Sequence, residues 1–260
     1  MRNINKIIVV ALTVFFITSC ANLPLYQSKE INSKDEISDL RYYNKENKIL
    51  YDVYDDENNI YVNIKTSNYY SQVKILEMGF TLWIDQKAKK KKDKGIVFPQ
   101  KQEFKRNQQN RSLNNTDSFN REEQRIEQLR TQFQLSIKNI VLIGMDGENS
   151  KRVFNTELEN SDIIATITFD TFNRLNYLAI IPKSKIFTDG KYNNNTFSIG
   201  IESGFMEMNS NKGSSGGKSG GGSRSGGMGG GKGQSNRSGG NMEQRSALSE
   251  PIKIWFSVSL

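Results

Sequence analysis

Histidine is absent from this 260-residue chain, and cysteine occurs once, at Cys20. The first absence excludes Ser–His and Cys–His nucleophile pairs, HExxH zinc sites and histidine-ligated iron. The second excludes a disulfide framework and every multi-cysteine metal site. Hydrophobic residues make up 35% of the chain, which suffices for one core in a domain of roughly 150–200 residues. The composition names no reaction, and we predict a protein that is not an enzyme, has no catalytic residues and needs no dissociable cofactor.

Long apolar runs are also missing, except at the N-terminus. There, Arg2 and Lys6 precede an apolar run over residues 7–17. This run has the length of a signal-peptide core and is too short to cross a bilayer as a helix. It leads into the tetrapeptide ITSC, which ends at Cys20 and resembles the lipobox of bacterial lipoproteins. An ordinary secretory signal is the alternative, but the only cysteine lies at the one position that the lipobox requires.

The lipobox resemblance implies that residues 1–19 are a signal peptide that is removed. It also implies that Cys20 carries a diacylglycerol and an N-linked acyl chain such as palmitate. Each buried methylene contributes about 0.8 kcal/mol, so two or three chains form a stable membrane anchor. We therefore expect an extracytoplasmic protein of the cell envelope or periplasm, lipid-anchored to the outer membrane. Residues 20–40 would be the lipidated cysteine and a polar tether.

The rest of the chain predicts mainly β-structure. Runs rich in β-branched and aromatic residues recur at roughly ten-residue spacing with turn residues between them. The predicted strands cover residues 49–54, 60–67, 80–85, 95–98, 135–144, 162–170, 174–182, 196–203 and 252–260. Helical patterns cover residues 69–78 and 119–133. We predict a single antiparallel β-sandwich, formed by residues 41–208 and 246–260, with one or two accessory helices.

A Gly-rich segment, residues 209–245, stands before the last strand. Such a composition cannot bury apolar surface, so we predict a disordered insertion. Its GSSGGKS stretch is one residue too short for a phosphate-binding P-loop and lacks the flanking strand and helix. The segment carries +5 of the formal charge of +8, and Arg2 and Lys6 carry two more. The sandwich is therefore nearly neutral, and no nucleic acid partner is expected.

An acidic turn lies between the first two predicted strands. Asp52, Asp55 and Asp56 supply oxygen atoms at a spacing that calcium could use. Their order does not match an EF-hand loop, and Asp is an ordinary turn residue. Calcium binding by these three residues is therefore a hypothesis, and we predict no other metal site.

A second charged feature is the lysine-rich loop after the strand at residues 80–85. Its lysines are Lys87, Lys89, Lys90, Lys91, Lys92 and Lys94. They could contact anionic headgroups, cell-surface phosphate or nucleic acid. No aromatic residue stands between them, so a base-stacking platform is not supported, and we favour a solvated loop.

Two further sets of residues are candidates for sugar chemistry. Glu77, Asp85, Asp170 and Glu202 could form carboxylate pairs for glycoside hydrolysis, but no motif joins them. Exposed aromatic residues could form a sugar-binding face, and the candidates are Tyr42, Tyr43, Tyr51, Tyr54, Tyr61, Tyr69, Tyr70, Trp83 and Trp255. Both tryptophans lie in the most apolar strands, so we expect them in the core.

Several of these segments together resemble a known family. Asn59–Lys65, Gln72–Leu76, Gly79–Asp85, the lysines, Gly95–Pro99 and the later Pro251–Phe256 resemble a Bacteroidota-type lipoprotein family of unknown function. The strand NIYVNI after the acidic turn and the later WID also resemble DOMON-type domains and family-9 carbohydrate-binding modules. The latter are β-sandwiches whose ligands are sugars, haem or calcium. The resemblance identifies no ligand-binding residue, and the lack of histidine argues against haem.

The functional hypothesis follows from the anchor and the sandwich. We expect a membrane-anchored lipoprotein that acts as a non-catalytic binding or structural module of the cell envelope, with glycan as the candidate ligand. The alternative is an accessory subunit of an envelope protein complex that contacts an anionic partner through its basic loops.

Overall fold

The computed structural model describes residues 23–37, 39–101, 118–136, 139–156, 158–187, 195–207 and 246–260. The predicted signal peptide, Cys20 and the predicted insertion at residues 209–245 lie outside the described residues.

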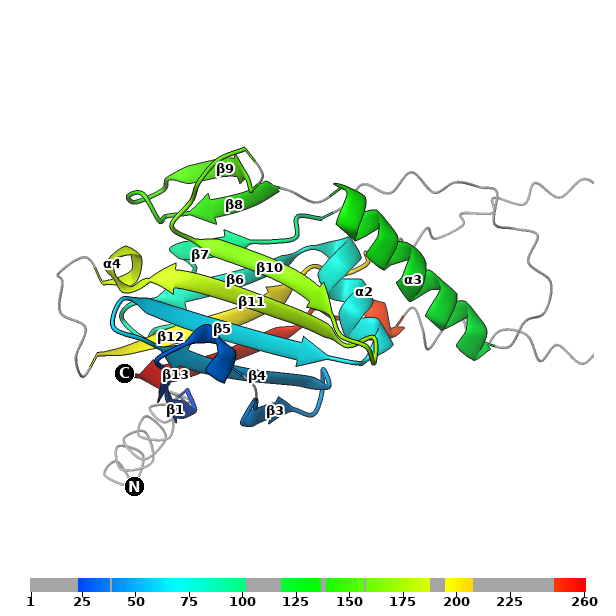
Figure 1. The fold of residues 1–260 in the computed structure, drawn as a ribbon, viewed down its shortest axis with the longest axis horizontal. Coiled ribbons are helices and arrows are strands. Elements are labelled where there is room, and N and C mark those ends of the chain that lie inside the picture. Colours follow the sequence, from blue (N-terminus) through cyan, green and yellow to red (C-terminus); the bar gives the residue numbers. More distant parts are fainter. Residues whose placement is uncertain are drawn as a thin grey trace, which may run out of the picture.

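Two β-sheets lie one behind the other and form a sandwich (Figure 1). The prediction of a mainly β sandwich with few helices is therefore confirmed. The strands are β1 (Leu25–Gln27), β2 (Lys29–Glu30), β3 (Tyr42–Asn44), β4 (Ile49–Asp55), β5 (Asn59–Thr66), β6 (Phe80–Asp85), β7 (Lys94–Val97), β8 (Asn139–Ile143), β9 (Lys151–Asn155), β10 (Ile164–Phe169), β11 (Leu175–Pro182), β12 (Thr196–Ser203) and β13 (Lys253–Ser259). The seven-stranded sheet has the order β1-β13-β12-β6-β7-β8-β9, and the six-stranded sheet has the order β10-β11-β5-β4-β2, with β3 also paired to β4.

The helices lie at the two ends of the sandwich. They are α2 (Tyr69–Met78), α3 (Ser118–Ser136) and the short α4 (Lys183–Ile186), and η1 (Lys34–Glu36) is a 3-10 turn. Figure 1 shows α2 and α3 at one end of the sheets and α4 at the opposite end. The Arg125 guanidinium of α3 donates to both carboxylate oxygens of Glu77 in α2 at 2.9 Å. The two longer helices therefore close the same end of the core.

Helix α2 has the bounds that its sequence predicts, because both ends carry local signals. The Asn68 side chain accepts a hydrogen bond from the Ser71 amide at 3.1 Å and caps the first turn. Gly79 ends the helix with a φ of 87°, a conformation that favours glycine. A β-carbon at Gly79 would also lie 2.8 Å from the backbone nitrogen of Lys101.

One continuous core fills the space between the sheets. Alternate residues of each strand point inward, as in β6, where Phe80, Leu82 and Ile84 are buried. The Phe80 and Tyr177 rings from opposite sheets meet edge to face, with centroids 4.8 Å apart. Because both sheets contribute to this core, it fixes the register of every strand and leaves the odd-numbered residues of β6 on the outer surface.

The N-terminal segment differs from the predicted tether. Strand β1 pairs with β13 and β2 pairs with β4, and both pairs are parallel rather than antiparallel. Ile31 is buried against Tyr54 and Tyr61 on the outer side of the six-stranded sheet. These strands have two or three residues each, too few to show a periodic pattern, and they form because the sheet edges offer them unpaired backbone groups. Strand β3, which follows the tether, and strand β9 were likewise not predicted.

The last two strands are antiparallel neighbours, with Gly200 opposite Trp255. The chain between them, which includes residues 209–245, therefore joins adjacent strands of one sheet. This connection needs no crossover, because β12 ends and β13 begins at the same end of the sheet. Near that end, the Met206 amide donates to the Leu248 carbonyl at 2.9 Å.

Candidate functional site

Both tryptophans of the chain lie on the outer face of the seven-stranded sheet. Trp83 alternates with the core residues Leu82 and Ile84, and Trp255 alternates with Ile254 and Phe256, so both indoles point outward. Both are half-buried. The expectation that they lie in the core is wrong. The other outward positions of these strands, such as Thr81, Asp85 and Ser257, are polar, so the alternation of the strands places both tryptophans outward and only their apolar character had suggested the core.

The strand register places the two tryptophans on either side of one glycine. Gly200 of β12 is paired with Trp83 of β6 on one side and with Trp255 of β13 on the other. Neighbouring strands are about 4.8 Å apart, so the two tryptophan backbones are separated by about 10 Å. Gly95 of β7 extends this row, because it is paired with Trp83.

The glycines let the indoles lie along the sheet. A β-carbon on Gly200 would be 2.5 Å from the Trp255 ring, and one on Gly95 would be 2.7 Å from the Trp83 ring. Each indole therefore packs over the backbone of the next strand rather than standing away from it. A glycine inside a strand is a known sign of such a close approach, and it is the sequence signal that could have revealed this surface.

Glu202 holds the Trp83 indole in place. Its Oε2 atom accepts a hydrogen bond from Trp83 Nε1 at 2.8 Å and another from Lys92 Nζ at 2.5 Å. The Lys92 ammonium also lies 5.6 Å from the centroid of the Trp83 ring. We call the surface formed by Trp83, Trp255, Glu202, Gly95 and Gly200 the tryptophan face.

The lysine loop, residues 86–93, folds around a carboxylate beside this face. Asp85 is 5% exposed. It accepts hydrogen bonds from the amides of Lys87, Lys89 and Lys91 at 2.9, 2.6 and 3.0 Å. The amides fix the loop, which leaves the lysine side chains from 87 to 92 exposed. Lys94 differs, because its ammonium donates to the carbonyls of α4 and burial lowers its pKa.

The three predicted calcium ligands have separate partners. Asp52 is fully buried and binds Arg41, whereas Asp55 binds Lys183 at 2.9 Å. Asp56 caps its own turn. In the part of the chain that the structure describes, no three His, Cys, Asp or Glu residues gather in a way that could hold a metal. Calcium at this turn stays a prediction.

Asp56 shows how a turn carboxylate is held ionised. Its Oδ1 accepts from the amides of Asn58 and Asn59 at 2.7 and 2.6 Å, and its Oδ2 accepts from the Tyr61 hydroxyl. Burial raises the pKa of Asp56, but these hydrogen bonds outweigh it and hold the pKa below the usual aspartate value. Burial, together with the Asp56 carboxylate, raises the pKa of Tyr61 to about 12.

The tyrosines do not share an open sheet face. Tyr42 stacks on Tyr26 with centroids 3.8 Å apart, and Tyr51 packs beside them against the core. Tyr54 and Tyr61 are buried on the outer side of the six-stranded sheet, under the segment that contains Ile31 and Leu40. Tyr69 and Tyr70 lie on α2, and among the predicted aromatic candidates only Tyr43 is exposed, at 53%.

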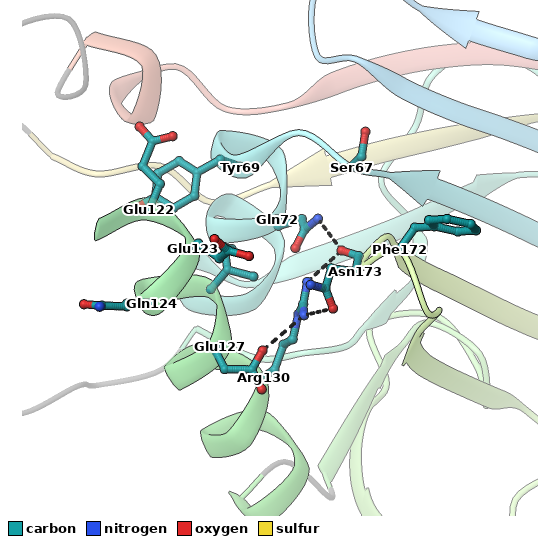
Figure 2. A pocket seen from close by; sticks show the side chains of 11 residues that line it. Ser67, Tyr69, Gln72, Glu122, Glu123, Gln124, Glu127, Arg130, Phe172 and Asn173 are labelled. Atoms are coloured by element: carbon teal, nitrogen blue, oxygen red, sulfur yellow. Dashed lines mark hydrogen bonds and ion pairs between the residues drawn. The ribbon is translucent and has the colours of Figure 1, made fainter. Parts of the chain in front are cut away.

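A groove of about 630 Å³ lies between α2, α3 and the β10–β11 hairpin (Figure 2). Figure 2 shows the Arg130 and Gln72 side chains converging on Asn173. The Arg130 guanidinium donates to the side chain and carbonyl of Asn173 at 2.5 and 2.7 Å, and the Gln72 amide donates to the same carbonyl at 3.1 Å. These contacts join the hairpin to both helices. The residues of the groove therefore hold the helices and the hairpin together. Glu123 and Glu127 also line the groove.

The carboxylates considered for hydrolysis lie in different places. Glu77 pairs with Arg125, and Asp170 pairs with Arg174 at 2.6 Å in the β10–β11 turn. Asp85 is enclosed by the lysine loop, and Glu202 lies on the tryptophan face. Glu202 and Asp85 share the outer face of one sheet, but the hydrogen bonds of Asp85 all go to backbone amides.

Comparisons with protein-family models, with curated proteins and with solved structures found no match to this chain. The resemblances to envelope lipoproteins and to carbohydrate-binding modules therefore remain predictions. Among the helices of the described residues, none is both long and apolar enough to cross a bilayer.

Proposed function

We propose that the protein is a lipid-anchored, extracytoplasmic module of the cell envelope that binds glycan on its tryptophan face. The observation that carries the proposal is the row Trp83–Gly200–Trp255, in which two outward indoles lie along the surface of one sheet. The lipobox ending at Cys20 supports the anchor and the location. Catalysis is not part of the proposal, because the two carboxylates described on this face are already engaged, Asp85 by backbone amides and Glu202 by Trp83 and Lys92.

The chemistry of the two indoles suits sugar rings. One face of a pyranose ring presents mainly C–H groups, which can stack on an indole and leave the hydroxyls free for polar contacts. If a ring covers on the order of 60 Å² of indole, the contact contributes about 1.5 kcal/mol, or roughly tenfold in Kd. The separation of about 10 Å between the two backbones lets one extended oligosaccharide contact both tryptophans.

Polar groups beside the indoles would fix the orientation of a bound sugar. The Glu202 side chain is 19% exposed and the Lys92 side chain is 48% exposed, so both can reach a ligand hydroxyl. A few convergent polar groups on an otherwise apolar surface are typical of a ligand site.

The test is a titration of the full-length chain in non-ionic detergent with a panel of oligosaccharides. Trp83 and Trp255 are the only tryptophans, so indole emission reports this face alone. We expect at least one oligosaccharide to shift the emission, and calorimetry to show Kd rising about tenfold in Trp83→Ala and in Trp255→Ala. Tyr43→Ala removes an exposed aromatic residue from the other sheet and serves as the matched control. The proposal is wrong if no oligosaccharide binds, or if both tryptophan variants bind as tightly as wild type.

A second observation favours the alternative, an accessory subunit of an envelope complex. Val97, Val141 and Val153 are in register on the same outer face, and Val153 is 53% exposed. The exposed Lys151 precedes Val153 in the edge strand β9 and points to the same side, which suits an anionic protein partner. Val153→Asp should then release a co-purifying protein and leave oligosaccharide binding unchanged. Unchanged co-purification would count against the alternative.

A further inference from the structure

We infer that the glycan recognised by the tryptophan face is anionic, with carboxylate or sulfate groups that the lysine loop binds. The inference rests on the proposed glycan-binding function and adds the chemical class of the ligand. It starts from the position of the loop, because Lys92 joins the loop to Glu202 and Trp83.

Backbone hydrogen bonds hold the conformation of the loop, so its lysine side chains are not needed for this and can contact a ligand. Three alternate amides, those of Lys87, Lys89 and Lys91, donate to the single carboxylate of Asp85. Asp85 points to the same side of β6 as Trp83. The loop is therefore held at the edge of the tryptophan face, and the lysine side chains extend from it into solvent.

The charges near the face do not balance. Lys87, Lys89, Lys90, Lys91, Lys92 and Lys253 stand near the face with Asp85, Asp93 and Glu202 as the opposing carboxylates. The Asp85 carboxylate is enclosed by the loop amides. Among the described residues, the only contact of Asp93 with these lysines is an exposed pair with Lys91 at 3.9 Å. Because the sandwich as a whole is nearly neutral, this excess of positive charge is a local feature of the face.

Lys92 can bind an anion without losing Glu202. An ammonium has three donor hydrogens, and the contact with Glu202 uses one of them. Lys92 is 48% exposed, so the others face solvent beside the Trp83 ring. A sugar stacked on Trp83 would therefore place a ring carboxylate or sulfate within reach of Lys92 and of the neighbouring loop lysines. Neutral glycans would gain the stacking contact only.

The test compares two oligosaccharides of equal length, one neutral (a cello-oligosaccharide) and one made of uronic acids (an oligogalacturonate). Tryptophan emission of the full-length chain in detergent reports binding at low and at high salt. We expect the uronate to bind on the order of tenfold more tightly at low salt, because several exposed charge pairs add. High salt should remove most of this advantage.

The variant is Lys87→Gln, Lys89→Gln and Lys90→Gln together, which keeps the amides that bind Asp85. Its control is Lys34→Gln, Lys45→Gln and Lys48→Gln, which removes the same charge from exposed positions associated with the other sheet. We expect the loop variant, which keeps Lys92, to lose most of the preference for uronate and the control to keep it. Far-UV circular dichroism checks that both variants fold.

The outcomes separate this inference from the proposed function. Equal affinity for both oligosaccharides, with loss of binding in Trp83→Ala, overturns the anionic class and leaves glycan binding standing. Binding of a single-stranded oligonucleotide or a polyglutamate peptide, without binding of either oligosaccharide, overturns both. Uronate preference that survives at full size in the loop variant also overturns the inference, because half of the six lysines near the face would then contribute nothing to it.

Discussion

Replacing Arg41 by methionine tests how the N-terminal segment is held to the six-stranded sheet. The Arg41 guanidinium forms two hydrogen bonds of 2.7 Å with the carboxylate of Asp52, one to each oxygen. It also donates to the Gln27 carbonyl at 2.9 Å. The side chain of Asp52 is completely buried, whereas that of Arg41 is 36% exposed. Methionine keeps most of the aliphatic volume and removes the charge.

The expected cost follows from what Asp52 retains. Removing one partner of a buried ion pair costs about 3–5 kcal/mol, because the remaining charge is left without compensation. Here, Asp52 still accepts from the backbone amides of residue 41 and Val53 at 3.1 and 2.8 Å. Water can also enter where Arg41 was exposed. We therefore expect a loss of about 2–3 kcal/mol in the free energy of unfolding, a large part of a typical domain stability.

Urea unfolding followed by far-UV circular dichroism measures this loss, and hydrogen exchange locates it. Exchange should rise in residues 25–31 and 41–44, where β1 to β3 pair with the sheets, and stay unchanged in β11. The double variant Arg41→Met with Asp52→Asn should recover part of the loss, because the buried group is then neutral. A loss below about 1 kcal/mol for Arg41→Met, or no recovery in the double variant, would refute this reasoning.

Three further predictions concern the anchor, the tryptophan face and the acidic turn. Cys20→Ala should move the protein from the membrane fraction to the soluble fraction, and retention in the membrane would contradict the lipoprotein prediction. Gly200→Ala should change the unfolding free energy by no more than about 1 kcal/mol but lift the Trp255 ring, so oligosaccharide affinity should fall several-fold in calorimetry; unchanged affinity would show that the ring position is unimportant. Hydrogen bonds lower the pKa of Asp56, so its stabilising charge is present above the unfolded pKa of about 4 and is lost as pH falls through the lower folded value. The difference in urea stability between wild type and Asp56→Asn should therefore shrink at low pH, and a constant difference would contradict this.

Local sequence signals were enough to predict the longer helices and strands. Asn68 and Gly79 mark the two ends of α2, and each acts through its own backbone neighbourhood. Strands β4 to β7 and β10 to β13 carry enough β-branched and aromatic residues to be found within a short window. Strands β1 and β2 could not be predicted in this way, since their few residues depend on edges supplied by β13 and β4, far away in the sequence.

The candidate site could likewise be predicted from the sequence only in part. The apolar strands around Trp83 and Trp255 are visible in the sequence, and so is the excess of lysine after Asp85. Their meeting is not visible, because it requires that β12 lie between β6 and β13 with Gly200 in the shared row. The acidic turn is the opposite case, because residues that are neighbours in the sequence do not form a common site. Asp52, Asp55 and Asp56 are close in the sequence, but their carboxylates bind Arg41, Lys183 and the amides of the turn, respectively.

The sequence by itself determined the strand-rich class of this protein, its longest helices and the segments where charge accumulates, because these properties depend on residues within a few positions of one another. Only the tertiary structure decided which strands became neighbours and which tryptophans faced outward. The physical reason is that strand order and register are set by packing both sheets around one core. A shift of one residue would turn every side chain of a strand to the opposite face, so the tryptophan face exists only through the register that the whole sandwich imposes.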